Sequence, residues 1–430
     1  MSGRAATLVR PAAGQRARQP VSVRHWYRMP VVLGMTWVIS LGTVWAWAAR
    51  VYYKAPHGFV DLAVYRFGIR AWWHGGDMYG KLPPTVAGHL PFVYPPITVL
   101  VLGPLDWVSW GHAIILTELA SLAALAVVGY LTFLRVFPGA GRRGALLAAA
   151  VLLPASLLLE PVWDTIWYGQ INIVLMAMVV VDCLAGGRRW PRGVLIGVAA
   201  AIKLTPAVFL VYFLLRKDYR SALRMTITAA VITLLGFAVS WSGSLKYWFG
   251  SSGGARSISG SAFFTNQTIA GALARWNWPH GVQTALWLTG SLLLLGVTAL
   301  GIRRATRMAD TPLALVVTAG FGLIVSPTSW SNHWVFVVPA VIVLAGRAWQ
   351  RPSLRWTLAC LAVLTVFYTA PFLGLTPRTA RWSLLDQLPG NAFTLLGIAL
   401  LVACAVPDVP ETLRVVRARL ASRTEPAGER

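Results

Sequence analysis

The carboxylate with the most favourable setting for chemistry is Asp61, in the stretch HGFVDLAVYRFGIRAWW. Tyr65 follows it by four residues, so a helix would place both side chains on one face, beside Arg66. A carboxylate in this setting suits a general base, which removes a proton from a reacting hydroxyl. The same residues also fit a solvated loop acid, or an ion pair between Asp61 and Arg66. Chemistry alone leaves these interpretations open.

Two basic groups accompany apolar sequence further along the chain. Lys203, in GVAAAIKLTPAVF, lies deep in an apolar run, where a charge is costly and therefore indicates function. It could contact a phosphate as a point charge, or it could snorkel or pair with a helix carboxylate. His333, in SPTSWSNHWVFVVP, stands beside Trp330 and Asn332. This polar and aromatic group suits a sugar or a phosphate, although a single histidine is often an ordinary interface residue.

Side-chain amides form a third set of candidates near predicted helix ends. Gln170 and Asn172 occur in WYGQINIVL, and Asn266 and Gln267 occur in FFTNQTIAGALAR. Amides can both donate to and accept from the hydroxyls of a sugar. The other acids in this part of the sequence are interpreted as structural: Asp77, Glu118, Glu160 and Asp164.

Motifs for nucleotide, metal or soluble-cofactor chemistry are missing from the sequence. It contains no Walker loop, HExxH or Ser-His-Asp signature, and no GxGxxG follows a predicted strand. Cys183, Cys360 and Cys404 lie in apolar runs without CxxC spacing, so they are predicted to be small core residues. We therefore expect no cofactor, no metal ion and no disulfide.

The elements that must position these residues are predicted to be transmembrane helices. Of the 430 residues, 57% are hydrophobic and 12% are charged, and the mean hydropathy is +0.62. The apolar runs are roughly 15 to 24 residues long, which suits helices crossing about 30 Å of hydrocarbon. The net charge of +24 comes from basic residues in short loops and tails, the pattern of cytoplasmic segments rather than of a nucleic-acid surface.

The chain is predicted to be an all-α integral membrane protein with about twelve transmembrane helices. Residues 1–30 form a basic tail, residues 31–407 the membrane domain, and residues 408–430 a second basic tail, with both tails cytoplasmic. The first apolar run follows many arginines and is too long for a signal peptide, so it is predicted to stay uncleaved. The other expected helices cover 97–110, 111–134, 144–159, 171–185, 193–215, 221–240, 283–302, 313–326, 334–346, 356–375 and 392–407.

Two long segments are predicted to lie outside the membrane, at 50–96 and 241–282. The first contains many Pro and Gly residues and a short amphipathic helix around Asp61 that would lie at the interface. Between residues 97 and 215, full crossings would leave basic loops outside, against the charge rule. One or two segments there are therefore expected to be short or re-entrant, which leaves the side of Gln170 and Lys203 open.

Seven short strings in a fixed order carry a resemblance to a known family: FVDLAVYR, GDMYG, FVYPP, YGQIN, AAIKLTPAVF, NQTIAG and SPTSWSNHW. They span residues 59–334. Each string is weak alone, but their order and spacing are specific. The sequence resembles the polyprenol-phosphate-dependent glycosyltransferases of the GT-C superfamily, in the branch of actinobacterial α-1,2-mannosyltransferases.

This resemblance implies a GT-C helical bundle and a catalytic aspartate in the first outer loop, which corresponds to Asp61. It also implies a polyprenyl-phosphate-mannose donor, a phosphatidylinositol mannoside acceptor, inversion, and an active site on the outer face of the plasma membrane. Within these motifs, we infer contacts to the donor phosphate from Lys203, His333 and Arg66. Contacts to the sugar or acceptor are inferred for Tyr65, Tyr94, Gln170, Asn172, Asn266, Gln267, Trp330 and Asn332.

Two rival functions fit parts of the same sequence. A related transferase could use a decaprenyl-phosphate-arabinose donor, because the same cavity could hold a five-carbon sugar. A lipid or solute transporter would explain the number of helices and the buried Lys203. The long outer loop with its acid and the lack of internal repeats weigh against transport. The oligomeric state is not predicted.

Overall fold

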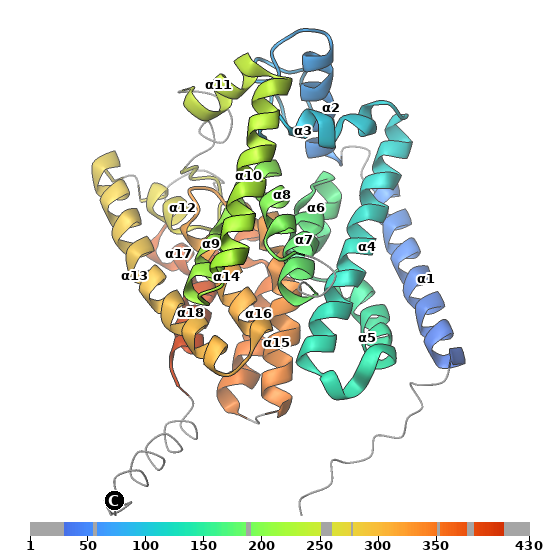
Figure 1. The fold of residues 1–430 in the computed structure, drawn as a ribbon, viewed down its shortest axis with the longest axis vertical. Coiled ribbons are helices and arrows are strands. Elements are labelled where there is room, and N and C mark those ends of the chain that lie inside the picture. The colour runs from blue at the N-terminus through green and yellow to red at the C-terminus, as the bar shows by residue number, and fades with distance from the viewer. Residues whose placement is uncertain are drawn as a thin grey trace, which may run out of the picture.

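The computed structural model describes residues 30–54, 58–185, 191–250, 260–276, 278–350, 353–375 and 382–407. In these ranges the chain is a bundle of helices without β-strands, apart from two isolated bridges (Figure 1). The predicted all-α class is therefore confirmed. The basic tails predicted at 1–30 and 408–430 lie outside the described residues, except for Pro30.

The described helices include six that are long and apolar enough to cross a membrane, or up to eight if two bent helix pairs each form one span. The chain is therefore a multi-pass membrane protein, but the predicted number of about twelve spans is not confirmed. The six are α1 (Pro30–Lys54), α4 (Trp110–Val136), α10 (Tyr219–Val239), α13 (His280–Arg307), η6 with α15 (Ser331–Phe336 and Val337–Gln350) and α16 with η7 (Leu354–Thr369 and Pro371–Gly374). The bent pairs are η3 and α5 (Pro138–Ala140 and Gly141–Ser156) with α6 (Glu160–Tyr168), and α17 (Leu384–Gly390) with α18 (Ala392–Ala405).

The expected span at 193–215 is broken in its middle. Lys203 has an extended backbone (φ −148°, ψ 128°), and Pro206 follows three residues later. Proline has no backbone N–H and its ring hinders a continuous helix, so the chain restarts here with a tighter turn. The pieces are α8 (Val194–Ile202), η4 (Thr205–Val208) and α9 (Phe209–Leu215).

The expected helix at 97–110 is also too short to span. It consists of α3 (Thr98–Val101) and η2 (Gly103–Asp106), which lie near the same end of the molecule as α2 (Figure 1). Short, broken segments thus occupy the region between residues 97 and 215, where a count of full crossings would place basic loops outside, against the positive-inside rule.

In the described part of the predicted loop 50–96, α1 extends to Lys54, and α2 (Val60–Trp73) is docked onto the end of α6. Phe59 precedes α2 in the left-handed conformation (φ 63°), and its N–H donates to the Trp167 carbonyl at 2.7 Å. Gly169 caps α6 with φ +67°, and a Cβ there would lie 2.8 Å from Leu62 Cβ. Only glycine permits this close approach, which fixes the first turn of α2 beside residue 170.

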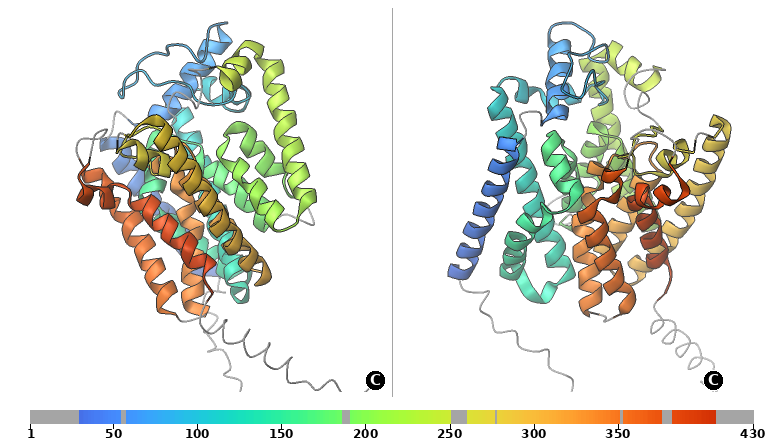
Figure 2. Two further views of the ribbon diagram at one scale, coloured as in Figure 1. Left: turned by 90° about the vertical axis from the view of Figure 1, so that its left-hand side faces the viewer. Right: turned by 180° about the vertical axis from the view of Figure 1, so that it is seen from behind.

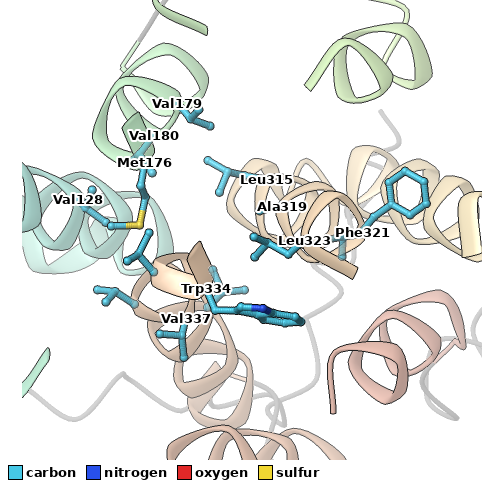
Figure 3. Packing of buried hydrophobic residues seen from close by; sticks show 14 of the residues in the cluster. Val128, Met176, Val179, Val180, Leu315, Ala319, Phe321, Leu323, Trp334 and Val337 are labelled. Atoms are coloured by element: carbon cyan, nitrogen blue, oxygen red, sulfur yellow. The ribbon is translucent and has the colours of Figure 1, made fainter. Parts of the chain in front are cut away.

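The core lies where α4, α7 (Asn172–Leu184), α14 (Thr311–Val325) and α15 meet (Figure 3). Met176 and Val180 of α7 are fully buried, as are Leu315 of α14 and Val337 of α15. α7 and α14 are surrounded by other helices, so apolar residues occupy nearly all their faces. This packing holds the N-terminal end of α7 next to η6.

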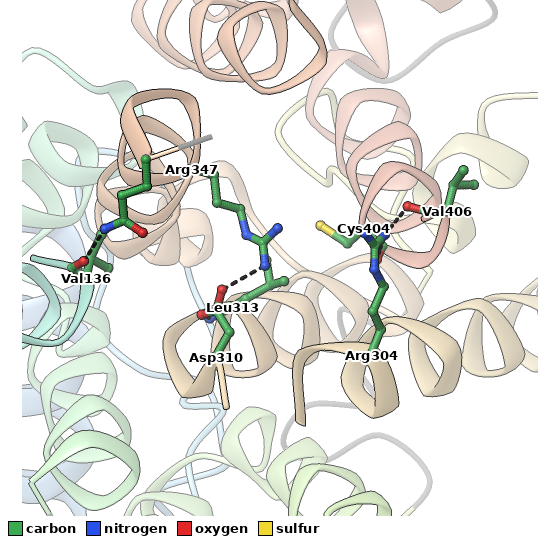
Figure 4. Close-up of polar contacts among 8 residues, drawn as sticks. Val136, Arg304, Asp310, Leu313, Arg347, Cys404 and Val406 are labelled. Carbon is green, nitrogen blue, oxygen red and sulfur yellow. Dashed lines mark hydrogen bonds and ion pairs between the residues drawn. The ribbon is translucent and has the colours of Figure 1, made fainter. Parts of the chain in front are cut away.

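Polar contacts close the opposite end of the bundle (Figure 4). Arg347 of α15 forms an ion pair of 2.7 Å with Asp310, whose other oxygen caps α14 through the N–H of Leu313 at 3.0 Å. Arg304 of α13 donates to the carbonyl of Val406 after α18. The start of α1 and the end of α18 also lie at this end, away from α2 (Figure 2).

Candidate active site

Asp61 occupies the first turn of α2, one turn before Tyr65. Its Oδ2 accepts a hydrogen bond of 2.7 Å from Gln170 Nε2, and none of the described residues donates to Oδ1. Burial raises the pKa of the Asp61 carboxyl to about 6, although the Gln170 hydrogen bond and the charge of Lys203 act in the opposite direction. One carboxylate oxygen is therefore held in place and the other remains open.

Two tyrosines fix the amide that holds Asp61. The hydroxyls of Tyr65 and Tyr94 each donate to Gln170 Oε1 at 2.9 Å, and they lie 2.9 Å from each other. Their rings meet edge to face with centroids 5.0 Å apart. Burial raises the pKa of Tyr65 well above its usual value, so its hydroxyl stays protonated and available as a donor. The amide nitrogen of Gln170 is thereby turned towards Asp61.

Lys203 anchors the other side of this network. Its Nζ donates to Asn172 Oδ1 at 2.8 Å and to Tyr94 OH at 3.4 Å, and it lies 3.1 Å from His333 Nε2. An ammonium group has no acceptor, so His333 Nε2 accepts and the imidazole proton lies on Nδ1. His333 Nδ1 is buried and has no hydrogen-bond partner in the described structure. Asn172 is held in turn by the carbonyl of Asn332 at 3.0 Å.

Asp61 and Lys203 form no direct ion pair, because uncharged groups stand between them. The connection runs from Asp61 through Gln170 and Tyr94 to Lys203. Asp61 keeps one oxygen without a donor, and the three N–H groups of Lys203 meet only neutral acceptors, so neither charge is neutralised as in a closed ion pair. The break after α8, the start of α7 and the first turn of α2 together create this arrangement.

Arg66 lies apart from this network. At about 100° per residue it points roughly 140° away from Asp61 around α2. Its guanidinium donates to Asp106 at 3.1 Å and to the Val108 carbonyl at 3.0 Å. The alternative in which Asp61 pairs with Arg66 is therefore wrong. The predicted contact between Arg66 and a phosphate finds no support in this geometry.

The amides at positions 266 and 267 are also occupied elsewhere. Asn266 and Gln267 are fully buried, and their side-chain nitrogens and oxygens all bond within the protein, largely to backbone groups. Trp330 forms a backbone bridge with Asn266 and packs against Phe263 at 6.1 Å. These three residues tie the segment after 260 to the segment before η6. The prediction that Asn266 and Gln267 contact a sugar is corrected to this structural role. The sugar contact of Trp330 stays a prediction, and Asn332 joins the site through its carbonyl.

A small cavity of about 40 Å³ adjoins the Lys203 group, between α7, η4, α14 and η6. Asn172, Lys203 and His333 form its polar part, and nearly all the remaining lining is apolar. Such a cavity suits an amphiphile whose anionic group meets the ammonium and whose chain lies against apolar side chains. The apolar lining consists of Leu175, Met176, Pro206, Val208, Phe209, Ala319, Gly322, Leu323, Val335 and Phe336.

Two acids that the sequence marked as structural lie close to the site. Glu160 and Asp164 are one helical turn apart on α6, with 1% and 9% of their surface exposed. α6 packs against η6, where Thr165 donates to the Asn332 carbonyl at 2.8 Å. Neither acid forms an ion pair with a described residue. The signal available in the sequence was a pair of acids at i and i+4 in a mainly apolar helix.

A multi-pass membrane protein with an open carboxylate, a separate ammonium group and an adjoining amphiphilic cavity has the form of a lipid-dependent transferase. Comparison with known proteins agrees: the profile of glycosyltransferase family 87 matches residues 92–327, more than half of the sequence. The chain belongs to glycosyltransferase family 87. It is a glycosyltransferase, so the transporter hypothesis is set aside.

Mycobacterial relatives match nearly the whole chain. The polyprenol-phosphate-mannose-dependent alpha-(1-2)-phosphatidylinositol mannoside mannosyltransferase of Mycobacterium tuberculosis is 39% identical, covering 86% of this chain and 88% of the relative. Its namesake from Mycolicibacterium smegmatis is 38% identical, covering 90% of each chain. A pentamannoside mannosyltransferase of M. tuberculosis is 32% identical, covering 80% of this chain and 78% of the relative. No solved structure matches the chain.

Proposed function

We propose that this enzyme transfers mannose from a polyprenyl-phosphate-mannose donor to a phosphatidylinositol mannoside, forming an α-1,2 bond on the outer face of the plasma membrane. The names of the two mycobacterial relatives that are 39% and 38% identical support the donor and the acceptor. They favour mannose over arabinose as the sugar. The single structural observation behind the proposed mechanism is the open Oδ1 of Asp61, whose other oxygen is held by Gln170.

In the proposed reaction, Asp61 Oδ1 accepts the proton of the acceptor hydroxyl as the oxygen attacks C1 of mannose. The bond between C1 and the phosphate oxygen breaks, and its electron pair leaves with the phosphate. A single displacement of this kind inverts the configuration, so a β-linked donor gives an α-linked product. A carboxylate with a pKa of about 6 is ionised at neutral pH and is still a stronger base than an ordinary aspartate.

The leaving phosphate is proposed to bind at Lys203 and His333. Lys203 supplies a positive charge, and the unpartnered His333 Nδ1 supplies an N–H donor. Fixed donors of this kind stabilise negative charge as it develops on the leaving group. The apolar cavity beside them would take the first part of the polyprenyl chain. Asn172 keeps the ammonium in place through its 2.8 Å hydrogen bond.

The proposed orientation places Asp61 outside and the chain termini inside. The described chain begins and ends at the end of the bundle opposite α2 (Figure 1). Basic residues gather at that end too: Arg216 contacts Thr311 at the start of α14, and Arg303 and Arg307 lie in the last turns of α13. Cytoplasmic loops are rich in arginine and lysine, which supports this assignment.

The test is transfer by the purified protein with polyprenyl-phosphate-mannose or decaprenyl-phosphate-arabinose as donor and a phosphatidylinositol mannoside as acceptor. We expect mannose transfer only, with an α-linked product by NMR. Asp61→Asn keeps the size of the side chain and the Gln170 contact, so it should fold and bind donor, yet lose about 10²–10⁴-fold in rate. Native rates for Asp61→Asn would show that Asp61 is not the general base. Transfer of arabinose alone would show that the donor is decaprenyl-phosphate-arabinose and not polyprenyl-phosphate-mannose.

A further inference from the structure

A second cavity, of about 190 Å³, lies between the turn after α2 and the start of α11 (Trp241–Phe249). We call it the α2–α11 pocket. It is lined mainly by polar side chains and exposed glycine backbone, in contrast to the apolar cavity beside Lys203. The lining residues are Gly75, Gly76, Asp77, Met78, Ser240, Ser242, Gly243 and Lys246.

Glycine backbone forms part of the wall of this pocket. α2 ends as the N–H groups of Gly75 and Gly76 donate to carbonyls of its last turns, with Gly75 at φ +74°. No atom lies within 4 Å of the position of a Cβ on Gly75, so that wall is open. A Cβ on Gly243 would lie 2.6 Å from Ser240 Oγ at the start of α11 and 3.4 Å from Met78 Cε, so a larger residue would crowd the Ser240 hydroxyl beside the pocket.

The polar groups of the pocket offer both donors and acceptors. Lys246 Nζ lies 2.7 Å from Asp77 Oδ2, with 53% and 43% of the two side chains exposed. Asp77 Oδ1 accepts a hydrogen bond of 3.1 Å from the N–H of Tyr79, which orients the carboxylate. The hydroxyls of Ser240 and Ser242 bond to no other described residue. Mixed donors and acceptors within one small volume suit a ring carrying several hydroxyls, rather than an apolar chain or a simple ion.

The pocket is mechanically linked to the active site. Tyr79 follows the pocket turn, donates to the Tyr94 carbonyl at 2.7 Å, and packs against Tyr247 of α11 with ring centroids 5.9 Å apart. Asp61 and Gly75 stand at the two ends of α2, about 20 Å apart at 1.5 Å per residue. A headgroup of several linked rings can reach from one to the other.

We propose that the α2–α11 pocket is a second sugar subsite, which binds a hydroxyl-rich ring of the acceptor headgroup remote from the attacking hydroxyl. This proposal rests on the proposed function, because only a multi-ring acceptor has a ring to place there. Asp77 accepts from ring hydroxyls, Lys246 donates to them, and the subsite selects acceptors by the length of the headgroup. It contributes to acceptor binding and not to the displacement itself.

The test compares a phosphatidylinositol mannoside carrying several mannoses with octyl α-mannoside, a short acceptor that cannot reach the pocket. Asp77→Ala and Lys246→Ala should each raise the KM for the glycolipid about tenfold, the loss of one hydrogen bond to a charged group. Ser242→Trp, at an exposed position, fills the pocket with the ion pair intact and should have the same effect. The kcat, the KM for the donor and transfer to octyl α-mannoside should stay native.

Arg70→Ala is the matched control, because it removes another exposed ion pair on α2, with Asp106 at 2.7 Å, outside the pocket. It should leave both acceptors unaffected. A native KM for the glycolipid in Ser242→Trp would mean that the Asp77–Lys246 pair only holds the structure together, and the subsite proposal would be wrong. Equal losses of transfer to the glycolipid and to octyl α-mannoside would also contradict it. If the native enzyme transferred mannose to neither acceptor, the proposed function would be overturned instead.

Discussion

Oppositely charged residues pair directly in one region of this protein and are kept apart by neutral side chains in another. At the end of the bundle away from α2, Arg347 and Asp310 meet directly at 2.7 Å, and Asp310 also caps α14 (Figure 4). In the candidate active site, Asp61 and Lys203 belong to one network but are separated by Gln170 and Tyr94. The first arrangement neutralises both charges, and the second leaves the charge of Lys203 without an anionic partner and one oxygen of Asp61 open to a ligand.

The difference indicates which ionisable residues work for stability and which for chemistry. A direct buried pair satisfies its members, so removing one leaves the other uncompensated. A separated pair is costly to keep, since each charge is only partly compensated by neutral dipoles. Such an arrangement is useful only where a substrate completes it. Mutations in the two regions should therefore affect different measured quantities.

The largest expected effect is on catalysis, from Lys203→Met. This change removes the ammonium and keeps a chain of similar length, so the leaving phosphate loses its positive partner. We expect kcat/KM to fall about 10²–10³-fold. The midpoint of thermal unfolding should change little, which a spectroscopic melt without donor would check. A large loss of stability with native turnover would show that Lys203 stabilises the fold and does not act in catalysis, which would contradict the contrast between the two regions.

The second prediction concerns pH. Asp61 acts as a base only when ionised, and burial raises its pKa to about 6. Transfer should therefore rise with pH and level off above pH 7, with about a tenfold lower rate at pH 5 than at pH 7. Initial rates at saturating donor would show this profile. A flat profile down to pH 5 would mean that Asp61 titrates lower, or that proton removal does not limit the rate.

The third prediction tests the stabilising region with Arg347→Met. Arg347 is largely buried, and its loss leaves Asp310 without its cation. We expect a destabilisation of about 1–3 kcal/mol, measured as a lower midpoint of thermal unfolding. Activity per folded molecule should remain native. Arg70→Met, which breaks a more exposed pair, is the control and should cost no more than about 1 kcal/mol.

The smallest expected effect comes from Gln170→Leu. The Gln170 hydrogen bond lowers the pKa of Asp61, so its loss should move the midpoint of the pH–rate profile upward. The rate at pH 8 should fall less than in Lys203→Met, because the base itself remains. A downward shift of the midpoint would contradict the assigned hydrogen bond.

Local sequence was enough for part of this description. The long apolar runs determined an all-α membrane protein, since a helix that satisfies its own backbone is the structure such runs adopt in lipid. The spacing of Asp61 and Tyr65 placed both on one helix face, which the structure confirms. The order of the motifs carried the family resemblance, which the match to glycosyltransferase family 87 bears out. These inferences need only neighbouring residues or their order.

Tertiary structure decided which residues meet. Gln170 lies 109 positions from Asp61, and no local pattern predicts their hydrogen bond. The sequence offered Arg66 as a partner for Asp61, but the packing of α2 directs it to Asp106. Asn266 and Gln267 have the residue types of a sugar site, yet packing buries them completely. Residue type fixes what a side chain can bond, whereas the bond it makes depends on which distant segments pack beside it.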